Sequence, residues 1–284
     1  VPPRPGDLVV PDEDGGDGTA PDADGRAGGD DATPREPQRL ETLLARATVL
    51  VIVPAGDDTG IGSGFFVGPD TIVTNRHVVE KRAERVLVTN PAIGRVLPAE
   101  VVAETPDAKP GAPDFAVLRV NTGDFTPPAL GVSTAIGRLD NVVAAGFPAI
   151  VVRSDARFKQ LAEGDGSAAP SANMQSGAVT VIQPHVAGDA EVILHSAEIS
   201  GGNSGGPLVD TCGRVVGVNT FVSAERQGTF RRLNYALHAR ELRRFLDGTG
   251  IAHRAVEGAC EPRVAAPPVA QASPPPAAPD ATAE

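Results

Sequence analysis

The sequence is most informative at Gly202–Pro207, which reads GNSGGP. A serine hydroxyl that acts as a nucleophile needs a tight turn that exposes its oxygen, and glycines permit such a turn. In this turn the N–H groups of Gly202 and Ser204 can converge on one point, where the negative oxygen of a tetrahedral intermediate would lie. A glycine-rich hairpin with a serine is also common in β proteins. The stretch therefore predicts a nucleophile only together with a base elsewhere in the chain.

A serine nucleophile needs a base that is mostly neutral near pH 7, and histidine is the usual one. His77 lies in the stretch TNRHVV, directly after an apolar run that predicts a strand. Asp114 precedes the apolar run FAVL and is the candidate for holding the imidazole in one tautomer. We expect the remaining histidines to be solvated loop or strand residues: His185, His195, His238 and His253.

The stretches TNRHVV, PDFAVL and GNSGGP resemble, in order and spacing, the His, Asp and Ser signatures of the chymotrypsin-like serine peptidases. The bacterial trypsin-like group that includes the HtrA/Deg proteases is most similar, over residues 47–247. The resemblance implies a serine endopeptidase that acts on protein or peptide substrates through an acyl-enzyme. Ser204 would be the nucleophile, His77 the general base and Asp114 the residue that orients the imidazole. The N–H groups of Gly202 and Ser204 would form the oxyanion hole, and no metal or cofactor is expected.

The sequence departs from this family in two places. No peptide-binding PDZ module follows residue 250, so regulation through PDZ peptides is not expected. Asn203 stands where digestive-type enzymes carry an Asp that pairs with a newly freed amino terminus, so activation by terminal insertion is not expected. The alternative function is a latent protease, or a catalytically silent binding protein with a protease fold. The oligomeric state stays open between a monomer and an HtrA-like trimer.

Substrate specificity depends on the pocket for the residue before the cleaved bond. The resemblance places this pocket around five residues: Glu198, Ile199, Thr220, Phe221 and Val222. A Glu198 carboxylate at the floor of the pocket would favour Lys or Arg. In the HtrA-like register Ile199 would instead line a pocket for small aliphatic residues, which is the preferred interpretation.

The chain between Thr48 and Leu237 reads as short β-branched runs separated by Gly, Pro, Asn and Asp. About a dozen such runs predict an all-β fold of two six-stranded antiparallel β-barrels, chymotrypsin-like by the resemblance. A C-terminal helix is predicted over Ala239–Asp247, which has one apolar face and is followed by Gly248. The polar segment Ala149–Ser176 has no clear strand and is predicted to be a long loop, either a lid or a disordered insertion.

The two ends of the chain differ in composition from the middle. Residues 1–38 hold ten acidic residues against three arginines, without apolar periodicity, and are predicted to be a disordered linker. Residues 259–284 are rich in Pro and Ala and are predicted to be a disordered tail, which leaves one trypsin-like domain at residues 39–258. Because the ends carry most of the net charge of −11, the middle has no basic face that could bind nucleic acid.

The cellular compartment is predicted from the apolar runs and the cysteines. The longest apolar runs, Val49–Ala55 and Val142–Val152, are too short or too interrupted to cross a bilayer. Cys212 and Cys260 form either a disulfide, as in an oxidising compartment, or two free thiols, and they offer too few ligands for a cysteine-based metal site. We expect a periplasmic or secreted protein whose signal peptide or anchor was removed before Val1.

Overall fold

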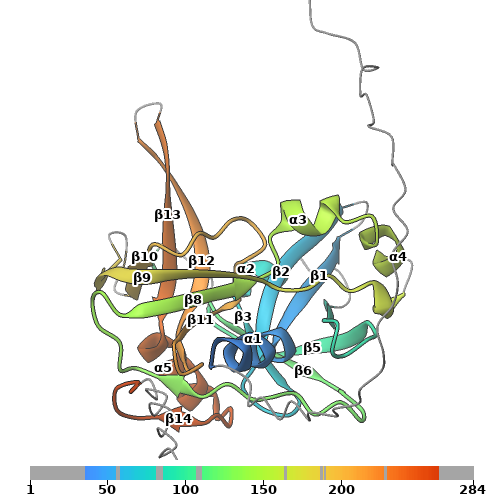
Figure 1. Cartoon of the computed structure of the whole chain (residues 1–284), viewed down its shortest axis with the longest axis horizontal. Helices are drawn as coiled ribbons and strands as arrows, with labels where there is room; N and C mark the ends of the chain where they lie inside the picture. The colour runs from blue at the N-terminus through green and yellow to red at the C-terminus, as the bar shows by residue number, and fades with distance from the viewer. Residues whose placement is uncertain are drawn as a thin grey trace, which may run out of the picture. The chain divides into compact units, whose positions relative to one another are not determined.

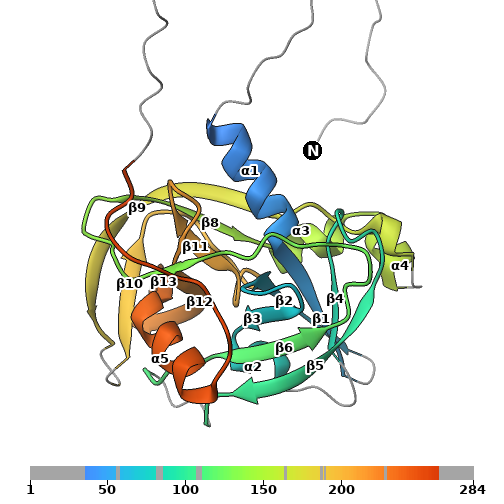
Figure 2. The same cartoon turned by 90° about the horizontal axis from the view of Figure 1, so that it is seen from below.

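The structure is a computed structural model, drawn in two orientations in Figures 1 and 2. It describes residues 36–55, 58–80, 86–106, 111–162, 165–185, 188, 190–226 and 229–261. The predicted acidic linker therefore lies almost entirely outside the described residues, and so does most of the predicted Pro/Ala-rich tail.

The first barrel is closed and antiparallel, with β-strands in the order β1, β2, β3, β6, β5, β4; Figure 2 labels all six. The β-branched residues of these strands fit a pleated surface that is buried on one side. Val51, Ile72 and Leu118 come from three different strands and meet in the interior, where all three are fully buried. The strand bounds are β1 Thr48–Ala55, β2 Asp58–Phe66, β3 Thr71–Thr74, β4 Val86–Thr89, β5 Leu97–Glu104 and β6 Ala116–Val120.

The second barrel follows the order β11, β8, β9, β10, β13, β12 and is closed by the pairing of β11 with β12. Two further strands, β7 (Val132–Ser133) and β14 (Ala255–Val256), extend the sheet beyond β12 through parallel pairing. The prediction of two six-stranded antiparallel barrels is therefore confirmed, with two short parallel strands added. The barrel strands are β8 Asn141–Gly146, β9 Asn173–Pro184, β10 Glu191–His195, β11 Pro207–Asp210, β12 Val215–Arg226 and β13 Thr229–His238.

The predicted C-terminal helix is present as α5 (Ala239–Thr249). Its first turn is capped by the ring of His238, whose Nδ1 accepts the N–H of Arg240 at 3.0 Å. The helix ends at Gly250, which takes the left-handed conformation that commonly follows the last turn. His238 is buried, so its interpretation as a solvated residue is wrong.

A helix that the sequence analysis did not predict, α1 (Glu36–Ala47), precedes the first barrel. Its leucines lie three and four residues apart, the spacing of one helical face, and Leu44 is fully buried in the same cluster as interior residues of the second barrel. Leu40 and Leu43 approach Gly213, in the turn between β11 and β12, so closely that a side chain there would collide with Leu43. This packing stabilises α1, which extends across the predicted boundary at residue 38.

The segment Ala149–Ser176, predicted to lack regular structure, instead forms two short helices, a 3₁₀ turn and the start of β9. Its few apolar residues explain the difference: Val152 and Leu161 are buried in a cluster with Leu50 and Ile52 of β1. The prediction of a long loop is therefore wrong for most of this segment. The elements are α3 Ala149–Ser154, α4 Phe158–Ala162 and η1 Gly166–Ala168 (Figure 2).

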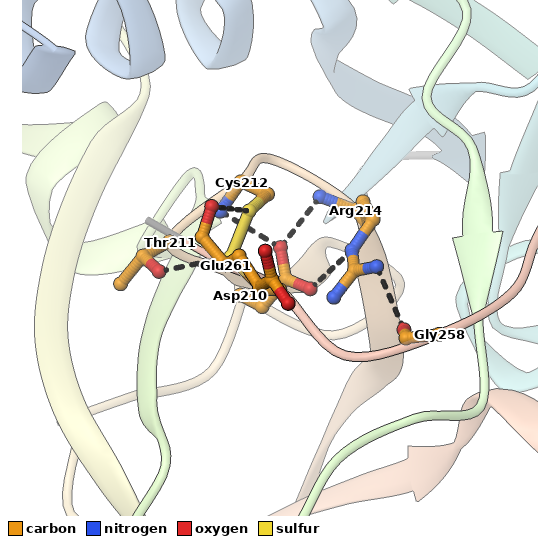
Figure 3. The surroundings of a disulfide bond; sticks show 7 residues. Asp210, Thr211, Cys212, Arg214, Gly258 and Glu261 are labelled. Atoms are coloured by element: carbon orange, nitrogen blue, oxygen red, sulfur yellow. Dashed lines mark hydrogen bonds and ion pairs between the residues drawn. A yellow bond between two sulfur atoms is a disulfide. The ribbon is translucent and has the colours of Figure 1, made fainter. Parts of the chain in front are cut away.

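Cys212 and Cys260 are joined in a disulfide whose Cα atoms lie 5.9 Å apart (Figure 3). Cys212 lies in the turn after β11, and Cys260 lies beyond β14. A buried ion pair supports the same turn, with Nε of Arg214 2.6 Å from Oδ2 of Asp210, and the guanidinium also donates to the carbonyl of Gly258 at 2.9 Å. The segment after α5 is thus attached to the second barrel by a covalent bond and by the Arg214 side chain.

No helix among the residues that the structure describes is long and apolar enough to cross a membrane.

Candidate active site

His77 lies in the short helix α2 (Arg76–Val79), which follows β3, and Asp114 lies just before β6, the strand paired with β3. Pairing of β3 with β6 brings the two residues together. The Nδ1 atom of His77 lies 2.5 Å from Oδ2 of Asp114, and the main-chain N–H of His77 donates to Oδ1 at 3.0 Å. The His77 side chain is 40% exposed and that of Asp114 only 11%. The carboxylate is therefore a nearly buried support for an accessible imidazole.

Asn75 connects this pair to the second barrel, a role that the sequence analysis did not assign. It is fully buried at the start of α2, but its side chain does not cap the helix. Instead its Nδ2 donates to the carbonyl of Asp114 at 2.7 Å, and the hydroxyl of Thr220 lies 3.3 Å from its Oδ1. An asparagine between a buried strand and a histidine was the available signal, but sequence alone does not name its partners.

The turn that carries Ser204 requires glycine at two positions. Gly202 has φ +101° and Gly205 has φ +85°, in the region that side chains rarely adopt. A Cβ atom on Gly202 would collide with the backbone of Phe147 and Ala149, and one on Gly205 would collide with the backbone of Ser63. The turn therefore packs backbone to backbone against both barrels.

The peptide groups of this turn are individually fixed. The carbonyl of Gly201 accepts the N–H of Ala149 at 2.7 Å, and the carbonyl of Asn203 accepts the N–H of Gly206 at 3.0 Å. Because C=O and N–H point in opposite directions across a trans peptide, these bonds direct the N–H groups of Gly202 and Ser204 away from Ala149 and Gly206. The N–H of Gly202 has no hydrogen-bond acceptor among the described residues.

Main-chain bonds also attach the turn that carries Ser204 to both barrels. The N–H of Ser63 in β2 donates to the carbonyl of Ser204 at 2.9 Å. In the second barrel, the N–H of Gly205 donates to the carbonyl of Asn219, and the N–H of Asn219 donates to the carbonyl of Gly206, both at 2.9 Å. The turn that carries Ser204 is thus held between β2 and β12. Asn75, two residues before His77, contacts Thr220 of β12 and so links the His77 segment to the same strand.

The residues predicted to form the specificity pocket occupy different environments. Ile199 is buried with Ile193 and Ala197 in the second barrel, whereas Glu198 is exposed. Thr220 is half-buried, and its hydroxyl lies 3.3 Å from Oδ1 of Asn75. The side chains of Phe221 and Val222 lie outside the described part of the structure.

His195 is also not the solvated residue that the sequence analysis expected. It is only 4% exposed at the end of β10, and neither ring nitrogen has a hydrogen-bond partner among the residues that the structure describes. Burial lowers its pKa to about 4, although a backbone interaction with Ala197 acts in the opposite direction. The interpretation is therefore wrong for His195 as well as for His238, whose pKa burial also lowers.

Comparisons with known proteins identify the family. Residues 62–218 match the model of the trypsin-like peptidase domain, and the chain belongs to this family. It is 36% identical to serine protease HTRA2, mitochondrial, of Bos taurus over 65% of this chain and 35% of the relative. It is 32% identical to the "Probable periplasmic serine endoprotease DegP-like" of Halomonas elongata over 62% of this chain and 32% of the relative. The resemblance to the HtrA/Deg group is therefore confirmed.

A solved structure shares the fold. The serine endoprotease from Yersinia pestis aligns with a TM-score of 0.55 and 23% identity, over 76% of this chain and 67% of that chain. The chain spans about a third of the length of the curated relatives it matches.

Proposed function

We propose that this chain is a serine endopeptidase in which Ser204 is the nucleophile, His77 the general base and Asp114 the residue that orients the imidazole. The observation that carries the proposal is the double contact of Asp114 with His77, 2.5 Å to the ring and 3.0 Å to the main chain. A carboxylate at Nδ1 keeps the proton on that nitrogen, which leaves Nε2 as the nitrogen that can accept a proton. Family membership and the glycine-dependent turn around Ser204 support the same assignment.

The reaction follows from these roles. The Oγ of Ser204 attacks the carbonyl carbon of the peptide bond while Nε2 of His77 takes its proton. The N–H groups of Gly202 and Ser204 bind the oxygen that becomes negative, and the fixed peptide planes of the turn support this role because preorganised donors do not have to reorient during the reaction. His77 then gives its proton to the leaving amine as the C–N bond breaks. Water, activated by the same histidine, hydrolyses the acyl-enzyme.

We further propose that small aliphatic residues are preferred before the cleaved bond. The buried Ile199 provides apolar surface in the segment just before the turn that carries Ser204. Glu198 is exposed, which argues against its carboxylate lying at the floor of the pocket. Unfolded proteins or peptides with Val or Ala at this position are therefore the proposed substrates. A periplasmic or secreted location is supported by the Cys212–Cys260 disulfide and by the periplasmic naming of a relative.

The test compares the wild-type chain with Ser204→Ala, using casein cleavage and covalent labelling by a fluorophosphonate probe. We expect Ser204→Ala to abolish labelling and to lower kcat about 10⁶-fold. Ser200→Ala is the matched control, because this serine lies four residues earlier in the same loop and should leave labelling intact. Labelling without cleavage would indicate a narrow or gated site. Folded wild-type protein with neither signal would contradict the proposal and favour a silent protease-fold binding protein.

A further inference from the structure

Ser63 lies at the junction of the two barrels and contacts the nucleophile turn through both its main chain and its side chain. It belongs to β2 of the first barrel and is fully buried. Its N–H donates to the carbonyl of Ser204 at 2.9 Å, and its own carbonyl accepts the hydroxyl of Thr74 at 2.7 Å. Thr74 is the last residue of β3, three positions before His77. The backbone of Ser63 thus joins the segments that carry His77 and Ser204.

The hydroxyl of Ser63 makes two further hydrogen bonds, both to the second barrel. It donates to the carbonyl of Gly202 at 2.7 Å and accepts the N–H of Phe147 at 2.8 Å. A hydroxyl has a single proton to donate, so the proton of Ser63 is committed to Gly202. The side chain therefore bridges two backbone groups, one in the nucleophile turn and one at the end of β8.

The carbonyl of Gly202 and the N–H of Phe147 lie next to the peptides whose N–H groups are the proposed oxyanion donors. The Gly202–Asn203 peptide, whose carbonyl Ser63 holds, lies between the peptides that present the N–H groups of Gly202 and Ser204. Phe147 lies two residues before Ala149, whose N–H holds the carbonyl of Gly201 and so directs the N–H of Gly202. One hydroxyl therefore fixes the turn from both sides.

The packing around Ser63 keeps its hydroxyl in this position. A Cβ atom on Gly146 would fall 2.9 Å from the Ser63 hydroxyl oxygen, and one on Gly206 would fall 3.2 Å from the Ser63 Cβ atom. Glycines thus leave just enough room for a serine side chain at the interface. Glycine also gives Gly202 wide backbone freedom, so this turn needs external bonds to keep one conformation.

We propose that Ser63 is a positioning residue for catalysis, whose hydroxyl holds the oxyanion turn in its reactive form by bridging Phe147 and Gly202. This role rests on the proposed function. Without the hydroxyl, the carbonyl of Gly202 and the N–H of Phe147 lose their buried partner, and the Gly202–Asn203 peptide keeps the bond from the N–H of Asn203 to the carbonyl of Ser200 at 3.0 Å. The segment at Phe147 is released at the same time, which loosens the bond from the N–H of Ala149 to the carbonyl of Gly201. The direction of the Gly202 N–H is disturbed in this way, while the His77–Asp114 contacts stay intact.

The test uses Ser63→Ala, which removes the hydroxyl and creates no steric conflict. The control is Ser133→Ala, because Ser133 is also fully buried and its hydroxyl accepts one main-chain N–H, that of Ala135 at 3.3 Å. For each folded variant, the measurements are the rate of fluorophosphonate labelling, kcat and KM for one peptide, and amide hydrogen exchange over residues 145–149 and 199–206.

We expect Ser63→Ala to lower kcat and the labelling rate about 10- to 100-fold, with KM nearly unchanged. This decrease is at most about the size of the decrease in kcat caused by removing one oxyanion-hole donor. Exchange should accelerate in both segments, and Ser133→Ala should keep wild-type labelling. Equal labelling losses in Ser63→Ala and Ser133→Ala, or unchanged exchange over residues 199–206, would overturn the proposal. An unreactive wild type would contradict the peptidase assignment, and the exchange measurement would still decide whether Ser63 holds the turn.

Discussion

Asp114 contacts His77 at two points, with Oδ2 2.5 Å from Nδ1 and Oδ1 accepting the main-chain N–H at 3.0 Å. The second contact fixes which carboxylate oxygen faces the ring. It also constrains any amide that replaces the carboxylate, because the main-chain N–H always requires an acceptor at that place.

Asp114→Asn should therefore reverse the ring tautomer. The amide oxygen must accept the main-chain N–H of His77, so the amide NH₂ faces Nδ1 and makes that nitrogen an acceptor. The proton then lies on Nε2, which can no longer take the proton of Ser204. We expect kcat to fall about 10⁴-fold with little change in KM.

Steady-state kinetics with a peptide substrate checks this prediction. Asp70→Asn is the matched control, because Asp70 pairs with Arg119 on the surface of the first barrel and contacts none of the proposed catalytic residues. A loss smaller than tenfold in Asp114→Asn would argue against the orienting role.

The residue before the cleaved bond should be small and aliphatic, as Ile199 suggests, rather than basic, as Glu198 would favour. A panel of peptides with Val, Ala, Leu, Phe, Lys or Arg before the cleaved bond should give kcat/KM at least about tenfold higher for Val or Ala than for Lys or Arg. Glu198→Gln should leave this ranking unchanged, because the Glu198 side chain is exposed. Dominance of Lys and Arg that disappears in Glu198→Gln would instead indicate a carboxylate in the pocket.

The disulfide should contribute measurably to stability. It closes a loop with a sequence separation of 48 residues, for which chain entropy predicts a contribution of about 4 kcal/mol to the free energy of unfolding, less any strain. We expect the double variant Cys212→Ser/Cys260→Ser to lose up to this amount in urea unfolding. A reducing agent should have the same effect on the wild type and none on the double variant. Equal free energies of unfolding for the oxidised wild type and the double variant would mean that the disulfide does not stabilise the folded chain.

The three candidate catalytic residues could be predicted because each lies in a short local sequence pattern. His77, Asp114 and Ser204 each follow or precede an apolar run with a short signature, and the structure pairs His77 with Asp114 through adjacent strands. Asn75 and Ser63 lie within residues 62–218, which match the family model, yet their roles depend on partners far along the chain. The Ser63 hydroxyl reaches a carbonyl 139 residues away and an N–H 84 residues away. No local pattern specifies such partners.

The missed helices have a related explanation. The first residues of α1 fall within the acidic, Pro-containing stretch, so composition hid a helix whose leucines find their partners on a turn of the second barrel. In α3 and α4 the overall Gly/Ser/Ala content outweighed Val152 and Leu161, which become buried only because β1 of the first barrel lies beside them. Tertiary packing, rather than propensity, decides short elements of this kind.

The buried His195 should make stability depend on pH. Its pKa is about 4 in the folded chain against 6.5 for an ordinary histidine, because burial disfavours the charged ring. Between these values the unfolded chain binds a proton that the folded chain does not, so the free energy of unfolding falls as the pH is lowered from 6.5 towards 4. A shift of this size corresponds to about 3 kcal/mol over the whole interval. Above pH 6.5 both states carry the neutral ring, and His195 then adds no pH dependence.

Urea unfolding of wild type and His195→Leu at a series of pH values between 4.5 and 7.5 checks this prediction; these limits bracket most of the interval between the two pKa values. Other groups that titrate, including His238, are common to both proteins and cancel in the difference between them. We expect the stability of His195→Leu relative to wild type to increase steadily as the pH is lowered through this range. A constant difference across the range would mean that the folded chain protonates His195 as readily as the unfolded chain does, and that the ring reaches water despite its burial.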